Sequence, residues 1–309
     1  MINCPFEKVL LPVDRSENSL RAINFAGALL SGVDSSEVTL LYVMTGGYLS
    51  ERMKNIDFRA ELIKETQTFK KIREKHIEEN IIPFLTEYED NLKKSGFKGT
   101  LSKLVEEGEA GNKIIEVATR EKFQTVIMAR RGMSEWKGYI LGSVSNKVIH
   151  GLLNQNIYIV GQKITENPLS HILLPVDGSE YSMKAVQHAA CLAKQVKAIQ
   201  KITILRVINV SLYLERVRQG IDPEAEAEET LSKAKKILTD EGVETGLIET
   251  KSVVGFPKDE IIKEVQEFGY NLVIMGRKGR SAIKDIVLGG VSSSVLNNCF
   301  EQTIAIINQ

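Results

Sequence analysis

The sequence predicts an α/β protein built from two similar domains in tandem, each a doubly wound unit with a parallel sheet. Three observations support this prediction. Short apolar runs alternate with stretches of helical periodicity, which is typical of strand–helix–strand units. The same order of runs occurs twice along the 309 residues. In each copy the fourth apolar run ends in a glycine-rich turn, and the spacing of the landmarks around that turn is identical in the two copies.

The first copy begins with an apolar run at residues 8–14 that ends in Leu-Pro-Val-Asp. A continuous run of this kind favours a strand buried on both faces of a parallel sheet. Ser16 and Ser19 can cap the next stretch, where apolar residues recur at helical spacing up to Leu30. Residues 38–43 form the next apolar run. The order strand, helix, strand is the start of a doubly wound unit.

Residues 50–95 are rich in Glu, Lys and Arg, with isolated apolar positions between them. They predict a long helical excursion, broken near Pro83. A helix with this much charge is usually a solvated face, and the alternative is a surface for a partner. After it we expect strands at residues 101–105, 125–129 and 156–160, with helices around 114–118 and 143–152.

The pattern restarts after a polar linker at residues 161–170. Residues 171–177 repeat the Leu-Pro-Val-Asp ending, residues 185–193 repeat the amphipathic helix, and residues 202–207 and 302–307 repeat the second and last strands. Residues 211–241 form a shorter charged excursion. The duplication therefore predicts two domains, residues 1–163 and 170–309.

The composition excludes several classes of function. Lys+Arg and Asp+Glu balance at 40 each, so no basic excess indicates a nucleic-acid partner or an anionic membrane. No apolar stretch approaches the roughly 18 residues of a membrane span, and the N-terminus does not resemble a signal peptide. Cys4, Cys191 and Cys299 are few, odd in number and far apart, which favours reduced, buried thiols. We therefore expect a cytoplasmic protein.

Three features of each copy fall at the C-terminal ends of strands, where an open parallel sheet binds its ligands. They are Asp14 or Asp177, the segment after Val43 or Val207, and the glycine-rich turn. Glycine allows backbone N–H groups to approach a bulky anion, and a helix beginning there adds the positive end of its dipole. The turns therefore suit phosphate. Ser143 and Ser145 add hydroxyl groups in the first copy, and Arg130 and Arg131 follow the fourth strand, where they can neutralise charge.

Asp14 and Asp177 would be repelled by phosphates. Their carboxylates suit a sugar, whose hydroxyl groups would donate hydrogen bonds to them. They also suit a divalent cation such as Mg²⁺, which would link each carboxylate to the phosphates. The alternative is that each aspartate only caps the helix that follows it. A plain strand-to-helix connection is likewise the alternative for each glycine turn, but the duplication of the whole arrangement argues against it.

The Pro-Val-Asp ending, the Val-Ile-Met-Gly strand end and the spacing Gly, two residues, Gly, nine residues, Gly-Ser resemble the universal stress protein family over the whole chain, twice. The resemblance implies a five-stranded parallel fold of Rossmann-like, adenine nucleotide alpha hydrolase-like type, with strand order 3-2-1-4-5, that binds ATP or AMP. In the first copy it places the following residues at the nucleotide: Pro12, Asp14, Val43, Ala129, Gly132, Gly142, Ser143, Val144 and Ser145. In the second copy they are Pro175, Asp177, Val207, Gly276, Gly279, Gly289, Gly290, Val291 and Ser292. The aspartates would meet ribose or adenine, the backbone at the two valines of the second strands would meet adenine, and the glycine turns would hold phosphates.

Each copy departs from the family pattern once. Ala129 stands where the first glycine is expected, and its methyl group can crowd the sugar. Gly290 stands where serine is expected, which removes one hydrogen bond, worth about 1 kcal/mol or somewhat more to a charged group. We therefore expect both copies to bind, with unequal affinity.

The leading hypothesis is a nucleotide-binding regulatory or stress protein, with no catalytic residue assigned and no metal site formed by the protein alone. One alternative is a weak ATPase. The other is an interaction module without nucleotide, acting through the last strand of each copy, residues 157–160 and 303–307. These strands lie at a sheet edge in the expected topology, and an exposed edge needs a partner. Family members dimerise through this strand, so the two copies can pair within one chain, and the charged excursions can join two chains as a homodimer.

Overall fold

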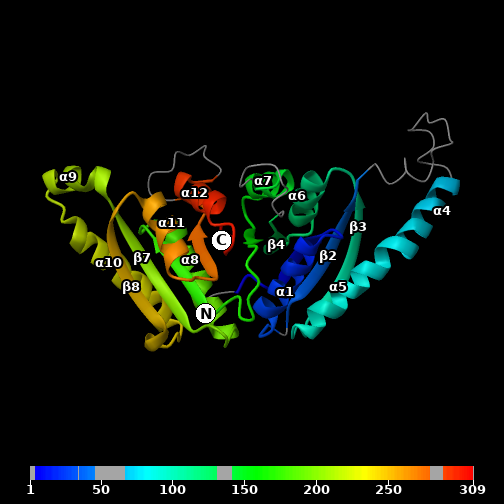
Figure 1. Cartoon of the computed structure of the whole chain (residues 1–309), viewed down its shortest axis with the longest axis horizontal. Coiled ribbons are helices and arrows are strands. Elements are labelled where there is room, and N and C mark those ends of the chain that lie inside the picture. The colour runs from blue at the N-terminus through cyan, green and yellow to red at the C-terminus, as the bar shows by residue number, and fades with distance from the viewer. Residues whose placement is uncertain (1–3, 34, 46–66, 131–140, 279–287, 309) are drawn as a thin grey trace.

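The computed structural model describes residues 4–33, 35–45, 67–130, 141–278 and 288–308. Within them, ten strands form one sheet in the order β3-β2-β1-β4-β5-β10-β9-β6-β7-β8 (Figure 1). Each half therefore has the predicted strand order 3-2-1-4-5, and the predicted tandem α/β fold is confirmed. The charged helices lie at the two ends of the elongated molecule, and the last strands of the two halves lie at its middle.

The first half contains β1 (Lys8–Val13), α1 (Glu17–Leu30), β2 (Glu37–Met44), α4 (Gln67–His76), a π-helical turn (Ile77–Ile81), α5 (Ile82–Lys94), β3 (Thr100–Glu107), α6 (Ala110–Arg120), β4 (Thr125–Ala129), α7 (Ser143–Gly151) and β5 (Asn156–Val160). Strands β1 to β5 pair in parallel with their neighbours. Their carboxyl ends therefore share one edge of the sheet. The strand order reverses between β1 and β4, which is where ligands bind in such sheets.

The second half repeats the plan with β6 (His171–Val176), α8 (Glu180–Gln195), β7 (Lys201–Asn209), α9 (Val210–Arg218), α10 (Pro223–Asp240), a 3₁₀ turn (Thr245–Leu247), β8 (Ile248–Gly255), α11 (Pro257–Glu267), β9 (Leu272–Gly276), α12 (Gly290–Asn298) and β10 (Thr303–Ile307). The longest described helix, α10, has 18 residues and is heavily charged. None of the described helices combines the length and the apolar character that crossing a membrane requires.

Two apolar cores lie on opposite faces of the sheet, and each extends through both halves. One packs the sheet against α1, α5, α8 and α10, and the other packs it against α6, α7, α11 and α12. Successive strand residues point to opposite faces, so Val273 belongs to one core and Ile274 to the other. This explains why the strands read as continuous apolar runs in the sequence.

The two halves meet along β5 and β10, which pair antiparallel with Ala305 opposite Tyr158. Tyr158 is fully buried there, and its hydroxyl group hydrogen-bonds Nε2 of His188 on α8 of the other half. Phe6 and Phe25 pack around the same tyrosine ring. The contact between the halves is therefore a packed aromatic core as well as a strand ladder.

The predicted break near Pro83 takes the form of a π-helical turn at Ile77–Ile81, immediately before α5. Proline has no N–H to donate and its ring crowds the preceding turn, so the helix loosens just ahead of it. The excursion is therefore helical from Gln67 to Lys94 with one irregular turn. Its earlier part, residues 50–66, lies outside the described residues.

The prediction of three reduced thiols is wrong for two of them. Cys4 and Cys191 form a disulfide, with their Cα atoms 5.7 Å apart, that ties the N-terminal segment of the first half to α8 of the second. Only Cys299 is a buried free thiol, as expected. The two partners are 187 residues apart in sequence, so spacing along the chain could not reveal that the fold brings them together. The cytoplasmic location stays a prediction.

Candidate functional site

A cavity of about 690 Å³ opens at the carboxyl edge of the second half, between the ends of β6, β7 and β9 and the start of α12. This volume suits a small organic ligand. The cavity brings together nearly all residues that the sequence predicts for this half: Pro175, Asp177, Val207, Gly276, Gly289, Gly290, Val291 and Ser292. Gly279, the remaining predicted residue, lies outside the described residues.

The start of α12 presents bare backbone to this cavity. Gly289 is the N-cap residue, and no side chain accepts a hydrogen bond from the first turn. A Cβ atom built on Gly290 would meet nothing within 4 Å, so open space lies directly over the helix start. The first N–H groups of a helix have no partner within the helix and attract anions together with the dipole. We call Gly289 and Gly290 with the amides of Val291 and Ser292 the α12 cradle.

Ser292 contributes to the cradle differently from the expectation. Its side chain is buried, and its hydroxyl group donates a 2.9 Å hydrogen bond to the carbonyl oxygen of Gly276. The hydroxyl proton is therefore not available to a phosphate oxygen, because it is hydrogen-bonded to the last residue of β9. Ser292 can offer its backbone N–H, and the serine hydroxyl fixes the helix start to the strand end.

Both aspartates shape the entry to the following helix without being its N-cap. The N-cap residues are Ser16 for α1 and Ser179 for α8. Asp14 Oδ1 accepts from the N–H of Ser16 and Asp177 Oδ1 from that of Ser179, each at 3.0 Å. This Asx turn explains a structural role for each carboxylate. Asp177 also lines the same cavity as the α12 cradle, so the structural role does not remove it from the site.

The carboxylate of Asp14 is held more tightly by side chains. It accepts from the hydroxyl groups of Ser16 and Ser19, the latter at 2.7 Å, and Ser19 Oγ also accepts from the N–H of Asp14 at 2.8 Å. Burial raises the pKa of this carboxyl, but the hydrogen bonds from Ser16 and Ser19 outweigh it, so the pKa lies below its ordinary value of 3.8. In the second half the equivalent serine, Ser182, donates to the carbonyl of Ser179.

We expect Ser19→Ala to destabilise the protein by about 1 kcal/mol at neutral pH, because it removes two hydrogen bonds of Asp14. The folded pKa of Asp14 is lowered, so the stabilisation is present above pH 3.8 and is lost as the pH falls through the folded pKa. Urea unfolding of the variant and the parent at several pH values measures this. Ser182→Ala is the matched control, with a loss that does not depend on pH in the acid range. An equal pH dependence in both variants would rule out the role of Asp14.

The first half places its predicted residues at the same edge of the sheet. Pro12 and Val43 lie near the ends of β1 and β2, Ala129 ends β4, and α7 begins at Ser143. Gly142 is the N-cap of α7 and again provides no side-chain cap. The cradle of this half consists of Gly142 and Ser143 with the amides of Val144 and Ser145. Ser143 is exposed and Ser145 is buried, so Ser143 holds the accessible hydroxyl group. Gly132 lies outside the described residues.

That the Ala129 methyl group crowds a sugar stays a prediction, which the surroundings of Ala129 do not favour. Ala129 packs against the core on the α1 face of the sheet. At the equivalent position of the second half, a Cβ atom on Gly276 would lie 2.5 Å from the backbone carbon of Tyr181 in α8. A side chain here therefore points at the neighbouring helix. Whether this position holds glycine or alanine therefore depends on how closely that helix approaches the end of the strand.

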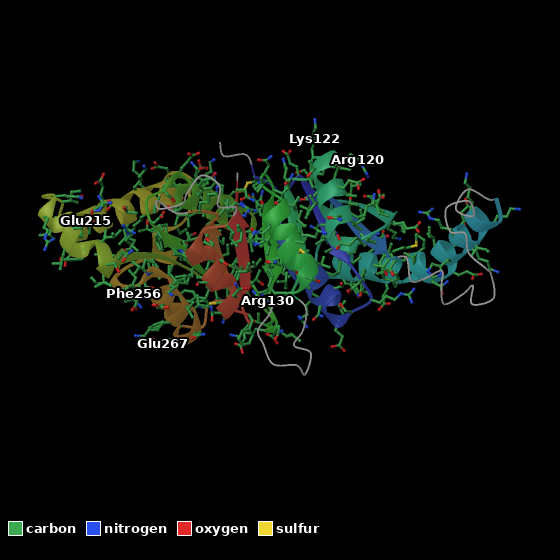
Figure 2. The ribbon with its side chains drawn as sticks, turned by 90° about the horizontal axis from the view of Figure 1, so that it is seen from above. Arg120, Lys122, Arg130, Glu215, Phe256 and Glu267 are labelled. Carbon is green, nitrogen blue, oxygen red and sulfur yellow. A yellow bond between two sulfur atoms is a disulfide. The ribbon has the colours of Figure 1, made fainter. Side chains whose placement is uncertain are left out.

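The prediction that Arg130 neutralises charge at the site is wrong. Arg130 is 2% exposed, and its guanidinium donates to the carbonyl of Leu296 on α12 of the other half (Figure 2). Arg277 is equally buried and reaches the carbonyls of Ile149 and Leu152 at the end of α7. Burial lowers the pKa of each guanidinium to about 10, so both stay charged at neutral pH. Arg131 lies outside the described residues.

The sequence did not predict the outer wall of the cavity. Leu212, Tyr213 and Arg216 line it from α9, and Lys258 lines it from the first turn of α11. Helix α9 follows directly from β7 and buries none of its residues, and three of these residues line the cavity. The charge of residues 211–241 had favoured a solvated helix face. The apolar residues between the charges of α9 were the one sequence signal that this helix could also line a cavity.

The charge of the cavity favours an anionic ligand. Its lining includes four cationic residues and two carboxylates: Arg206, Arg216, Lys258, Lys278, Asp177 and Glu226. Arg216 forms an ion pair with Glu226 at 4.0 Å. In the described part of the chain, no cluster of three or more His, Cys, Asp or Glu side chains has the arrangement of a metal site.

Comparisons with known proteins agree with the tandem fold. A sequence model of the Universal stress protein family matches residues 5–152 and 168–303. A universal stress protein of Methanocaldococcus jannaschii is 30% identical over 160 residues, which cover 49% of this chain and 91% of the relative. The crystal structure of a universal stress protein from Archaeoglobus fulgidus covers 97% of this chain and 98% of its own, with a TM-score of 0.66 and 21% identity, which shows a shared fold. A universal stress protein solved in complex with cAMP aligns with 45% of this chain and 96% of its own, with 24% identity and a TM-score of 0.35.

Proposed function

The chain belongs to the universal stress protein family, with its stress-response role, and we propose that it acts as an adenine-nucleotide-binding regulatory protein of that family. The observation that carries the proposal is the second-half cavity, where a glycine-built helix start and a carboxylate face one space of about 690 Å³. Two such halves in tandem, residues 1–163 and 170–309, give the protein two candidate sites.

The chemistry of the cavity fits each part of ATP or AMP in turn. The α12 cradle offers main-chain N–H groups to the phosphates, and Lys278 and Lys258 add positive charge to the same cavity. Asp177 offers a carboxylate to the ribose hydroxyls. The backbone at Val207, where β7 ends, offers hydrogen-bonding groups to the adenine edge. A Mg²⁺ ion would bind together with the phosphates, since the described protein groups form no metal cluster of their own.

We expect isothermal titration calorimetry of the full chain with ATP to resolve two sites of unequal affinity. Gly290 replaces the serine that Ser143 provides in the first half, so the first site has one more hydroxyl donor for phosphate. One hydrogen bond to a charged group is worth about 1.5–3 kcal/mol, which corresponds to roughly a tenfold difference or more in affinity. Absence of any heat with ATP and with AMP, or two indistinguishable sites, would contradict the proposal.

The assembly follows from the same sheet. In this proposal the two halves stay paired in solution through β5 and β10, in the way that the family resemblance implies for two separate chains. These strands are interior strands of the ten-stranded sheet, so a homodimer would form through another surface. Sedimentation of the chain with and without ATP measures this directly.

A further inference from the structure

Two buried arginines link the halves reciprocally. Arg277 follows the last residue of β9, and its Nη2 donates to the carbonyl of Ile149 at 2.8 Å and to that of Leu152. Arg130 follows the last residue of β4, and its Nη2 donates to the carbonyl of Leu296. Ile149 and Leu296 occupy the same position near the ends of α7 and α12. Each arginine therefore satisfies a carbonyl that the final turn of a helix leaves without an internal partner.

The helices that receive these arginines are the ones whose first turns form the two cradles. The nine residues of α12 run from the cradle at Gly290 to the turn that holds Arg130, and the nine of α7 run from Ser143 to the turn that holds Arg277. Arg277 also meets the cradle of its own half, because its carbonyl accepts a 2.9 Å hydrogen bond from the N–H of Gly289. One hydrogen-bonded path thus joins the α12 cradle, Arg277 and the far end of α7.

We propose that the two cradles are allosterically coupled through Arg130 and Arg277, so that an anion bound in one cradle strengthens binding in the other. This inference rests on the proposed function for the identity of the ligand. An anion at the start of α12 and a guanidinium at its end both stabilise the aligned peptide dipoles of that helix. Binding at one cradle orders its helix and the arginine attached to it. The second ligand then binds in the cradle of the other half, where the strand end and the helix are already ordered, so its binding loses less conformational entropy.

The two links differ in strength. The Nε of Arg277 donates to Oδ1 of Asn308, the residue after β10. The residue after β5 is Gly161, which has no side chain to offer, and the Nε of Arg130 is buried without a hydrogen-bond partner. A Cβ atom at Gly161 would lie 2.1 Å from the carbonyl oxygen of Glu301, so no side chain fits there. The Arg277 link is therefore the better-held of the two.

Titration of the full chain with ATP tests the coupling. Ser143→Asp and Gly290→Asp each place a carboxylate in one cradle and leave a single working site. Measured with both arginines changed to methionine, so that the carboxylate cannot act through them, these variants give the two intrinsic affinities. We expect the second binding step of the parent chain to be about fivefold tighter than these affinities predict for independent sites. In Arg277→Met most of this coupling should be lost, and with Arg130→Met added the isotherm should equal the sum of the two single-site isotherms. Arg130→Met is the matched control, with a partial loss of coupling.

A second readout needs no nucleotide. The carboxylate of Gly290→Asp stands in for a bound anion, and we expect it to slow hydrogen exchange of the α7 amides, including the Leu152 N–H that bonds the Val148 carbonyl, by about fivefold. Adding Arg277→Met should remove this effect. If that variant does not fold, Arg277→Lys takes its place, because lysine keeps the positive charge but lacks the planar guanidinium that donates to both carbonyls.

The outcomes separate the two claims. Additive isotherms in the parent chain, or coupling that persists when both arginines are methionine, overturn the coupling while leaving the nucleotide sites in place. If no protein binds ATP, the proposed function fails, and the exchange experiment still decides the coupling. Unchanged exchange in α7 with Gly290→Asp overturns it.

Discussion

Gly290→Asp is expected to weaken ATP binding at the second-half site by about three orders of magnitude while the protein stays folded. The carboxylate would lie at the start of α12, where the phosphates are proposed to bind. Two like charges about 4 Å apart near a protein surface repel by about 4 kcal/mol. The fold should tolerate the change, since a Cβ at Gly290 meets no atom within 4 Å and an acidic residue favours a helix start. Calorimetry and thermal unfolding measure the two effects.

Gly290→Ser is the matched control, because it restores the hydroxyl group that Ser143 provides in the first half. It should tighten the second site and narrow the difference between the two halves. Ser143→Asp should produce the mirror result, with the first site lost and the second retained. If Gly290→Asp binds ATP as the parent does at two sites, the phosphates do not lie on the α12 cradle.

Gly276→Ala is expected to destabilise the protein by about 1–3 kcal/mol and to weaken the second site. The new methyl group would lie 2.5 Å from the backbone carbon and 2.6 Å from the carbonyl oxygen of Tyr181. Overpacking against backbone forces the helix or the strand to move, at a cost of this size. Tyr181 lies in the first turn of α8, directly after the Asx turn of Asp177, so the movement displaces the proposed sugar-binding carboxylate.

The first half supplies the control for this prediction. Ala129 already carries a methyl group at the equivalent position and packs against the core. Ala129→Gly should cost about 1 kcal/mol or less and leave ATP affinity at the first site within a factor of two or three. Chemical unfolding and single-site titration measure both variants. A Gly276→Ala protein as stable as the parent would show that α8 does not approach the strand end this closely.

The inner strands were predictable because they are buried on both faces. Residues 125–129 and 156–160 were predicted with the bounds that β4 and β5 have, since five apolar or small residues between turns leave little choice of register. The cradles were predictable for a related reason. A strand end, two glycines and a helix start at fixed spacing can be recognised in one dimension, and the second copy showed that the spacing was not accidental.

The rest depends on contacts between distant segments. The direction of Arg130 is set by α12, where Leu296 lies 166 residues away, so its place at the start of the glycine-rich turn suggested the wrong partner. The sequence around Ala129 likewise does not show how closely a helix approaches it. Cys4 and Cys191 meet only because the halves pack together. Helix α9 buries none of its residues, as a solvated face predicts, and it also lines the cavity, which its charge did not predict.

The central claim is that main-chain amides at a glycine-built helix start hold phosphate while an aspartate across the same cavity holds the sugar. A crystal structure of the full chain grown with excess ATP tests it most directly. We expect phosphate oxygens within hydrogen-bonding distance of the Gly290, Val291 and Ser292 amides, with the ribose at Asp177. Nucleotide bound elsewhere in the chain, with α12 and Asp177 making no contact to it, would contradict the claim.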